Sequence, residues 1–202
     1  MHSLAAGKAT LATIVWPTTG THTNARIARN ILLAVVGSSL LWASAKVQVP
    51  FYPVPVTMQT FAVLALGMAY GWRLGAATVL LYLAEGALGL PVFAGTPEKG
   101  LGLAYMAGST GGYLFGFVLA AAACGWLAER GWDRTVVATA LAMLVGNVLI
   151  YIPGLIWLGI LFGWDKPVLA WGLFPFLLGD ATKAVLAAVV LPLTWRLISR
   201  RG

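Results

Sequence analysis

The sequence predicts an all-α integral membrane protein, a bundle of six transmembrane helices, from its composition, the lengths of its apolar runs and its aromatic content. Of its 202 residues 60% are hydrophobic and 9% are charged, which does not describe a soluble chain. A span needs about 20 apolar residues, so about six spans fit and no soluble catalytic domain does. Nine Trp, eight Phe and six Tyr indicate packed helices with aromatic residues near the membrane interfaces.

The basic residues decide between a nucleic-acid partner and membrane topology. The net charge is +7, but the 13 Lys and Arg lie singly or in small groups in loops and tails, so we expect no nucleic acid as a partner. The single Cys124 excludes a disulfide within the chain, and His2 and His22 have no neighbouring ligands. We therefore expect no metal and no cofactor.

Apolar runs divide the chain into residues 1–25, expected to be a cytoplasmic tail that is poorly ordered unless it docks, and a membrane domain over residues 26–202. Prolines at 50, 53 and 55 end the first run, and the second and third runs are short for a full crossing. The six expected spans are about Ile27–Val49, Val56–Tyr70, Leu74–Leu88, Gly108–Glu129, Arg134–Tyr151 and Phe174–Trp195.

Two segments are expected to lie outside regular spans. Pro91–Ala107 is rich in Gly and Pro and cannot be a regular helix throughout. Pro153-Gly154 is expected to end the fifth span. The apolar stretch Leu155–Trp164 that follows is too brief to cross a bilayer, so we expect an interfacial or re-entrant segment.

Six spans place both termini on one side of the membrane, and the distribution of Lys and Arg predicts that this side is the cytoplasm. An N-in, C-in topology puts three lysines outside and leaves Lys183 within a span. The same topology puts nine basic residues inside: Lys8, Arg26, Arg29, Arg73, Arg130, Arg134, Arg196, Arg200 and Arg201.

Small residues repeat every four positions in the fourth span, at Gly108, Gly112, Gly116, Ala120 and Cys124. Such a stripe lets another helix backbone approach closely, which predicts packing inside the bundle, with a partner interface as the alternative. In the fifth span we expect Asn147 to form a hydrogen bond between helices.

Three charged residues lie within apolar runs: Glu85, Asp180 and Lys183. A lone charge at mid-membrane is expensive, so such residues face a cavity or a partner. Asp180 and Lys183 are three residues apart, share a helix face and can neutralise each other near the outer side. They are either a structural ion pair or a site for a small polar head such as a urea, which needs both an acceptor and a donor. Glu85 is expected to cap a loop at the outer interface.

The residues of the spans predict binding rather than a reaction. Ser109 stands between glycines, but no His lies in any span to activate it. One alternative function is a proton-coupled or facilitative carrier that uses Asp180 and Glu85 as a relay. Another is a membrane-embedded enzyme that modifies lipids with these acids, although it would need a carboxylate pair for a metal, or a His.

Four blocks of sequence resemble the BioY family, the biotin-specific capture subunits (S components) of energy-coupling factor (ECF) vitamin transporters. The blocks keep the order and spacing of that family over about residues 30–196. They are Val49-Pro50-Phe51-Tyr52-Pro53-Val54-Pro55-Val56-Thr57-Met58-Gln59-Thr60, Tyr82 to Phe93, Gly108 to Phe117, and Pro175-Phe176 with Gly179-Asp180 and Lys183.

The resemblance implies a six-helix protein in the cytoplasmic membrane of a prokaryote. Such a protein captures biotin from outside and works with a transmembrane coupling subunit and two ABC ATPases, so it would not itself be an enzyme. Helix 1 of such subunits carries an Ala-xxx-Ala contact surface for the coupling subunit. This chain has Ala34 with Ser38 and Ser39 with Ala43 instead.

The resemblance also implies a biotin pocket made by Asp180, Lys183, Phe93, Tyr82, Tyr113 and Gln59. Asp180 would accept a hydrogen bond from a ureido N–H, and Lys183 would donate to the ureido oxygen or to the valerate carboxylate. The segments Pro91–Ala107 and Leu155–Trp164 would close over the ligand. Glu85 departs from the apolar residue that the family pattern leads us to expect at that position.

Overall fold

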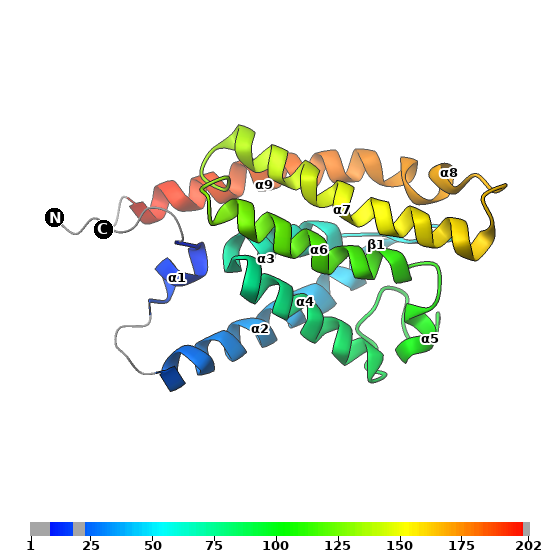
Figure 1. Ribbon diagram of the computed structural model, residues 1–202, viewed down its shortest axis with the longest axis horizontal. Helices are drawn as coiled ribbons and strands as arrows, with labels where there is room; N and C mark the ends of the chain where they lie inside the picture. The colour runs from blue at the N-terminus through cyan, green and yellow to red at the C-terminus, as the bar shows by residue number, and fades with distance from the viewer. Residues whose placement is uncertain (1–8, 18–22, 200–202) are drawn as a thin grey trace.

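The computed structural model describes residues 9–17 and 23–199, and that part of the chain is mostly helical (Figure 1). Four stretches are long and apolar enough to cross a membrane: Thr23–Lys46, Gly111–Ala128, Val136–Phe162 and Val168–Ile198. The elements are α1 (Leu11–Val15), α2 (Thr23–Lys46), β1 (Gln48–Val49), β2 (Val56–Thr57), α3 (Gln59–Tyr70), α4 (Trp72–Ala87), α5 (Gly102–Met106), α6 (Gly111–Ala128), α7 (Val136–Phe162), α8 (Val168–Gly172) and α9 (Phe174–Ser199). The expected mostly helical fold is thus confirmed, with four helical stretches that could span a membrane.

A short hairpin replaces the expected end of the first span. Helix α2 ends at Lys46, and β1 then pairs with β2 in antiparallel register, Gln48 opposite Thr57 and Val49 opposite Val56. The proline-rich segment between the strands forms the turn, where the missing N–H groups of proline are tolerated. The hairpin stands directly before α3, whose 12 residues span only about 18 Å, less than the roughly 30 Å core of a membrane.

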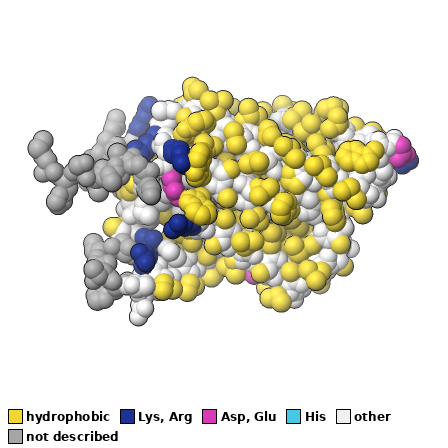
Figure 2. All heavy atoms as spheres, viewed as in Figure 1, with side chains coloured by type: hydrophobic (Ala, Val, Ile, Leu, Met, Phe, Trp, Pro, Cys, Tyr) yellow, Lys and Arg dark blue, Asp and Glu magenta, His cyan; other side chains and the backbone are white. Residues whose placement is uncertain are grey.

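Helix α6 runs through the middle of the bundle (Figure 1). It packs along α7 and also contacts α3 and α4, while α2 lies against α4 and α9 lies against α7. Helix α2 begins, and helix α9 ends, at the same end of the molecule. Figure 2 shows hydrophobic side chains over most of the visible face and Lys and Arg gathered at that end.

Glycines set the close contact between α6 and α7. A Cβ atom on Gly116 would lie 2.7 Å from the Cα atom of Ile150, and one on Gly112 would collide with the backbone oxygen of Pro153. Further along the same face, the buried Cys124 thiol donates a 3.2 Å hydrogen bond to the oxygen of Ala142. The stripe of small residues therefore serves packing inside the bundle, as its spacing predicts.

The expected break of the fifth span at Pro153-Gly154 is wrong. Helix α7 continues through Pro153 to Phe162, so Leu155–Trp164 is not a separate interfacial or re-entrant segment. A proline removes one backbone donor, but membrane helices tolerate this loss when neighbouring helices cover the position. Here α6 covers it: the ring of Tyr113 occupies the space that a side chain at Gly154 would fill.

Two polar predictions are also corrected. The Glu85 carboxylate caps no loop: it accepts a hydrogen bond from the hydroxyl of Ser38, so it joins α4 to α2 within the bundle. Asn147 is buried, and within the described residues its side-chain oxygen has no hydrogen-bond partner. The sequence correctly placed Asn147 within a helix of the bundle, but it could not show that the neighbouring helices offer no hydrogen-bond donor to its side-chain oxygen.

Only part of the expected tail over residues 1–25 is described. Helix α1 packs against α3 through the buried Leu11, so this apolar run docks on the bundle. Residues 1–8 and 18–22 lie outside the described part of the chain.

Gly116→Ala should destabilise the protein, because its new methyl group meets the Cα atom of Ile150 and neither backbone can yield cheaply. We expect a loss of about 1–3 kcal/mol, seen as a lower unfolding temperature in detergent. Gly179→Ala is the matched control, since no atom of the described residues lies within 4 Å of its added Cβ atom. Equal unfolding temperatures for the two variants would contradict the proposed contact.

Candidate functional site

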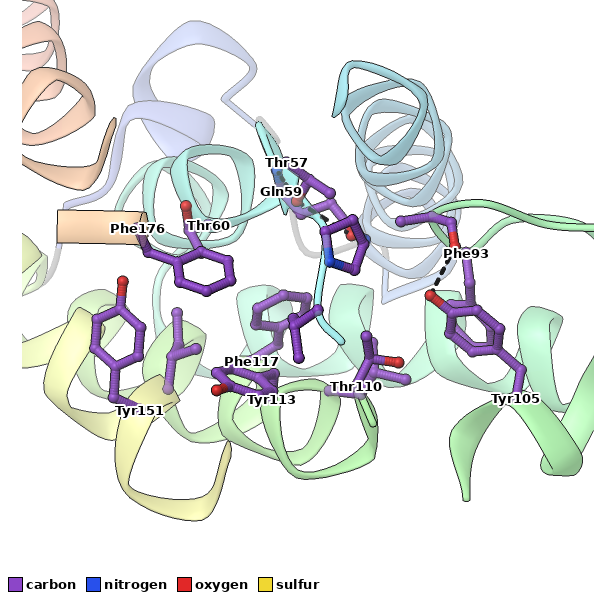
Figure 3. A pocket seen from close by; sticks show the side chains of 15 residues that line it. Thr57, Gln59, Thr60, Phe93, Tyr105, Thr110, Tyr113, Phe117, Tyr151 and Phe176 are labelled. Carbon is purple, nitrogen blue, oxygen red and sulfur yellow. Dashed lines mark hydrogen bonds between the residues drawn. The ribbon is translucent and has the colours of Figure 1, made fainter. Parts of the chain in front are cut away.

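A largely enclosed pocket lies among α3, α6, α7, α9 and the segments that follow β1 and α4 (Figure 3). Its volume is about 490 Å³, part of it open to solvent, and we call it the slot. Its lining is Val54, Pro55, Thr57, Gln59, Thr60, Phe93, Ala94, Tyr105, Thr110, Tyr113, Leu114, Phe117, Ile150, Tyr151 and Phe176. An apolar wall with a few polar groups is typical of small-molecule sites.

Aromatic rings line both ends of the slot. Phe93 stacks on Tyr105, with ring centroids 4.8 Å apart, at the end opposite Tyr151 and Phe176 (Figure 3). Tyr113 stacks against Phe176 at 6.3 Å and is anchored by its hydroxyl, which donates to the oxygen of Gly172 at 2.8 Å. Because these rings pack against one another, their faces are held in place around the slot.

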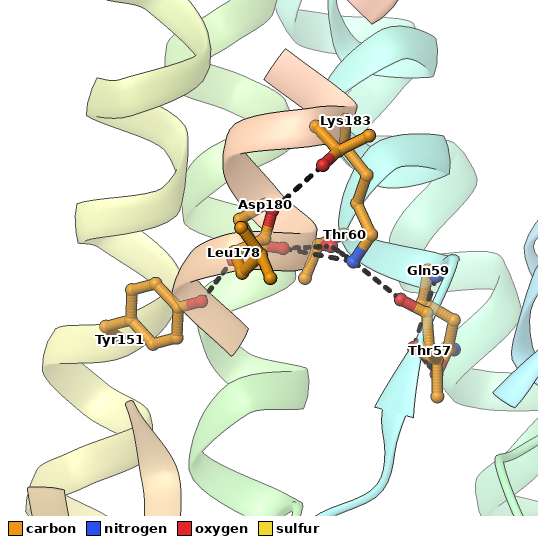
Figure 4. Close-up of polar contacts among 8 residues, drawn as sticks. Thr57, Gln59, Thr60, Tyr151, Leu178, Asp180 and Lys183 are labelled. Atoms are coloured by element: carbon orange, nitrogen blue, oxygen red, sulfur yellow. Dashed lines mark hydrogen bonds and ion pairs between the residues drawn. The ribbon is translucent and has the colours of Figure 1, made fainter. Parts of the chain in front are cut away.

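A buried ion pair lies behind one wall of the pocket (Figure 4). The Lys183 ammonium is 3.0 Å from Oδ1 of Asp180, and the two residues are only 7% and 4% exposed. Lys183 also donates to the backbone oxygen of Thr57 at 2.7 Å and to the hydroxyl of Thr60 at 2.8 Å. The predicted neutralisation of Asp180 by Lys183 on one helix face is confirmed.

Both carboxylate oxygens of Asp180 accept hydrogen bonds from neighbouring side chains. Oδ1 of Asp180 accepts from Lys183 and, at 3.1 Å, from the hydroxyl of Thr60, while Oδ2 accepts from the hydroxyl of Tyr151. Thr57, Thr60 and Tyr151 line the pocket, whereas Asp180 and Lys183 stand one layer behind them. A ligand could therefore reach the acid by exchanging hydrogen-bond partners.

Lys183 also lines a second hollow, on the side of the residue away from the pocket. It borders a more open groove between the β-hairpin and α9, whose other lining residues include Gln48, Thr57 and Thr182. Its ammonium thus sits in the partition between this groove and the slot. The partition consists of β2 and the start of α3.

Side chains from three helices hold the segment Val92–Thr96 that carries Phe93 into the pocket. Lys46, at the end of α2, donates to the oxygens of Phe93 and Thr96 at 3.1 and 3.0 Å. Tyr82 from α4 donates to the oxygen of Val92 at 2.9 Å, and Tyr105 from α5 donates to that of Ala94 at 2.8 Å. Burial raises the pKa of Tyr105, which keeps its phenol a donor.

The turn of the hairpin is held over the pocket in a similar way. Ser109, just before α6, donates to the oxygen of Pro53 at 2.7 Å, next to the lining residues Val54 and Pro55. Its hydroxyl therefore has a structural partner. Within residues 9–17 and 23–199, no group of three or more His, Cys, Asp or Glu side chains is placed to hold a metal ion.

The structure brings the predicted binding residues together in two layers. Phe93, Tyr113 and Gln59 line the pocket directly. Tyr82 stands behind Gln59, whose amide donates to its hydroxyl at 2.7 Å. Sequence reasoning missed Thr60, Tyr151 and Lys46, because each approaches the site from a different helix and none stands out by type in its own run.

The residues expected to face a coupling subunit are divided between the two sides of α2. Ser39 and Ala43 are exposed on its outer face, and Ala34 is half-buried. Ser38 is buried and turned to Glu85, so it contributes to the bundle rather than to the surface.

The fold and the pocket together define the class of the protein: a multi-pass membrane protein with a pocket between its helices. The chain belongs to the BioY family, whose sequence profile matches residues 16–200.

Curated relatives and a solved structure agree with this assignment. The chain is 35% identical to a probable biotin transporter BioY of Pyrococcus horikoshii, over 81% of this chain and 94% of the relative. It is 36% identical to the biotin transporter BioY of Thermotoga maritima, over 80% and 93%. The crystal structure of the S component for biotin from an ECF-type ABC transporter shares the fold with a TM-score of 0.69, at 23% identity, over 90% of this chain and 96% of that one.

Lys46→Met should loosen the segment Val92–Thr96, because it removes the hydrogen bonds from α2 to the backbone oxygens of Phe93 and Thr96 and to the hydroxyl of Thr96. We expect faster amide hydrogen exchange in a peptide covering residues 90–100, measured by mass spectrometry. Lys99→Met, which removes an exposed charge from the same loop, is the control. Unchanged exchange in Lys46→Met would mean that Tyr82 and Tyr105 hold the segment without it.

Proposed function

We propose that this chain captures biotin and mediates its uptake as the substrate-specific subunit of an ECF-type ABC transporter. The observation that carries the proposal is the aromatic slot with the Asp180–Lys183 network in its wall, in a chain of the BioY family. The thiophane ring and the side-chain methylenes of biotin are apolar, and its ureido ring needs a hydrogen-bond acceptor and a donor. The aromatic rings of the slot can contact the apolar part of biotin, and the Asp180–Lys183 network can bind the ureido group.

In this proposal the ureido head binds at the Tyr151 and Thr60 end of the slot. Asp180 accepts from a ureido N–H that takes the place of the hydroxyl of Tyr151 or Thr60. Lys183 pairs with the acid at 3.0 Å and holds the hairpin through the oxygen of Thr57. Phe93 and Tyr113 line the apolar body of the ligand, and Gln59, braced by Tyr82, adds a polar group to the wall.

We further propose that α2, α3, α4, α6, α7 and α9 all cross the membrane, with both termini in the cytoplasm. Support comes from α2 beginning and α9 ending at one end of the molecule, where Lys and Arg also gather. Helix α3 is too short to cross alone, so the hairpin before it fills the remaining depth. The membrane is the cytoplasmic membrane of a prokaryote.

The partners in the proposal are a transmembrane coupling subunit and two ABC ATPases, which hydrolyse the ATP. The docking surface is the outer face of α2, where the small side chains of Ser39 and Ala43 are exposed and Ala34 is half-buried. Small residues allow close approach of a second helix. Ser38 supports this face from inside through its bond to Glu85.

The double variant Asp180→Leu with Lys183→Met tests the binding role separately from folding. Replacing both charges by apolar groups of similar size is close to neutral for stability, whereas removing one charge leaves the other buried without a partner and destabilises the protein. We expect a folded, monodisperse protein whose Kd for biotin, measured by calorimetry in detergent, rises at least about a hundredfold. Asp180→Leu alone and Lys183→Met alone should bind biotin as weakly as the double variant does, and both should also unfold at a lower temperature.

The exposed pair Asp165 and Lys166, also 3.0 Å apart, supplies the matched control. Asp165→Asn with Lys166→Met should leave both Kd and stability unchanged, since exposed pairs contribute little. A double Asp180 and Lys183 variant that binds biotin as the parent does would remove the pair from the site and leave it a purely structural role.

Ala43→Trp should separate capture from uptake. The bulky ring blocks close approach to α2 but lies outside the pocket, so calorimetric biotin binding stays normal. Biotin uptake into vesicles that also contain the coupling subunit and ATPases should fall at least about tenfold. Val185→Trp, on an exposed position of α9, is the control. Equal uptake by both variants would move the docking surface elsewhere, and uptake without any ATPase would favour a carrier that works alone.

A further inference from the structure

A third hollow lies on the outside of the bundle, away from the slot. It is an open groove of about 710 Å³ between α4, α6 and α7. Half-buried alanines form part of it, and two tryptophans that are 40% and 47% exposed lie along it. Its lining is entirely apolar: Trp72, Leu119, Ala122, Ala123, Trp126 and Leu149.

One face of α6 changes from apolar to basic along this groove. Leu119, Ala122 and Trp126 follow one another at spacings of three and four residues, so they share that face. Arg130 follows in the turn after α6 and donates back to the oxygen of Trp126. From Leu119 to Ala128, where α6 ends, the helix rises about 14 Å, at about 1.5 Å per residue. This is nearly half of the roughly 30 Å hydrocarbon core, so the face of α6 on which the groove lies is about as deep as one leaflet.

Two arginines stand at the basic end of the groove, each over a tryptophan of its wall. The guanidinium carbon of Arg130 lies 3.2 Å from the centre of the Trp126 ring, and that of Arg73 lies 5.0 Å from the centre of the Trp72 ring. Arg130 also donates to the backbone oxygen of Trp126 at 3.1 Å. Both side chains are exposed, and stacking holds each guanidinium plane at the mouth of the groove.

The acid next to Arg130 is Glu129, and it has a structural partner. Its Oε1 accepts from the backbone N–H of Trp72 at 3.2 Å, which fixes the start of α4 against α6. Two guanidinium groups and one carboxylate leave a local charge of +1. That charge is the complement of one phosphodiester.

We propose that this groove binds an anionic glycerophospholipid, with one acyl chain along Leu119 to Trp126 and the phosphate on Arg73 and Arg130. Arginine binds phosphate oxygens through paired N–H donors, and its charge attracts anionic head groups. A chain in an apolar groove on this leaflet-deep face and a head group at its basic end match the gradient along α6. An apolar helix of a partner would fill the groove but leave both guanidinium groups without an anion.

The test uses the full chain in detergent with equal amounts of phosphatidylglycerol and phosphatidylcholine, and native mass spectrometry to count bound lipid. The unmodified protein should retain phosphatidylglycerol preferentially. Arg73→Gln with Arg130→Gln should reduce that retention about tenfold. Ala122→Phe, which fills the groove and keeps both charges, should reduce retention of both lipids.

Arg26→Gln with Arg29→Gln is the control, because it removes two charges from the start of α2, at the same end of the molecule but away from the groove. It should retain lipid as the parent does. The proposal is overturned if neither lipid is preferred, if the two arginine variants lose lipid equally, or if Ala122→Phe binds as the parent does. Normal biotin binding in every variant would show that each is folded.

Discussion

The buried Asp180–Lys183 pair is the interaction on which the site depends. Two charges taken out of water are destabilising unless further hydrogen bonds satisfy them, and here the neighbours supply these bonds. Lys183 reaches the β-hairpin at Thr57 and helix α3 at Thr60, and Asp180 reaches α7 at Tyr151. The pair therefore joins α9 to three other elements around one end of the slot. The hydrogen bonds that satisfy its charges also hold these elements in place, and so they set the shape of the pocket.

The glycines of α6 make that arrangement possible from the other side. Because Gly112 and Gly116 bring the backbones of α6 and α7 together, Tyr113 on α6 and Tyr151 on α7 meet edge to face with ring centroids 6.5 Å apart. Both rings line the slot, and the hydroxyl of Tyr151 also donates to Asp180. Packing of the bundle and orientation of the acid are thus set by the same helix contact.

Sequence alone predicted the features that depend on local spacing and composition. The apolar runs gave the long helices, and three-residue spacing gave the pairing of Asp180 with Lys183. The sequence-based predictions were wrong where the structure of a segment depends on an element far away in the chain. Pro153 does not end α7, because α6 covers that position, and Glu85 caps no loop, because Ser38 lies across from it.

The roles of Thr60 and Tyr151 were equally out of reach, since their partners lie 120 and 29 residues away. Their contacts bear on how a ligand would bind. A ureido N–H that displaces one of these hydroxyls exchanges one hydrogen bond for another, so the net gain from the polar wall is small. Affinity must then come mainly from apolar surface buried against Phe93, Tyr113 and Phe176, whereas the network penalises any head group that cannot replace the displaced donor. In such a site the rings supply most of the favourable binding energy. The ion pair discriminates against ligands whose head group cannot satisfy it, and removing the pair leaves the head group of biotin unsatisfied.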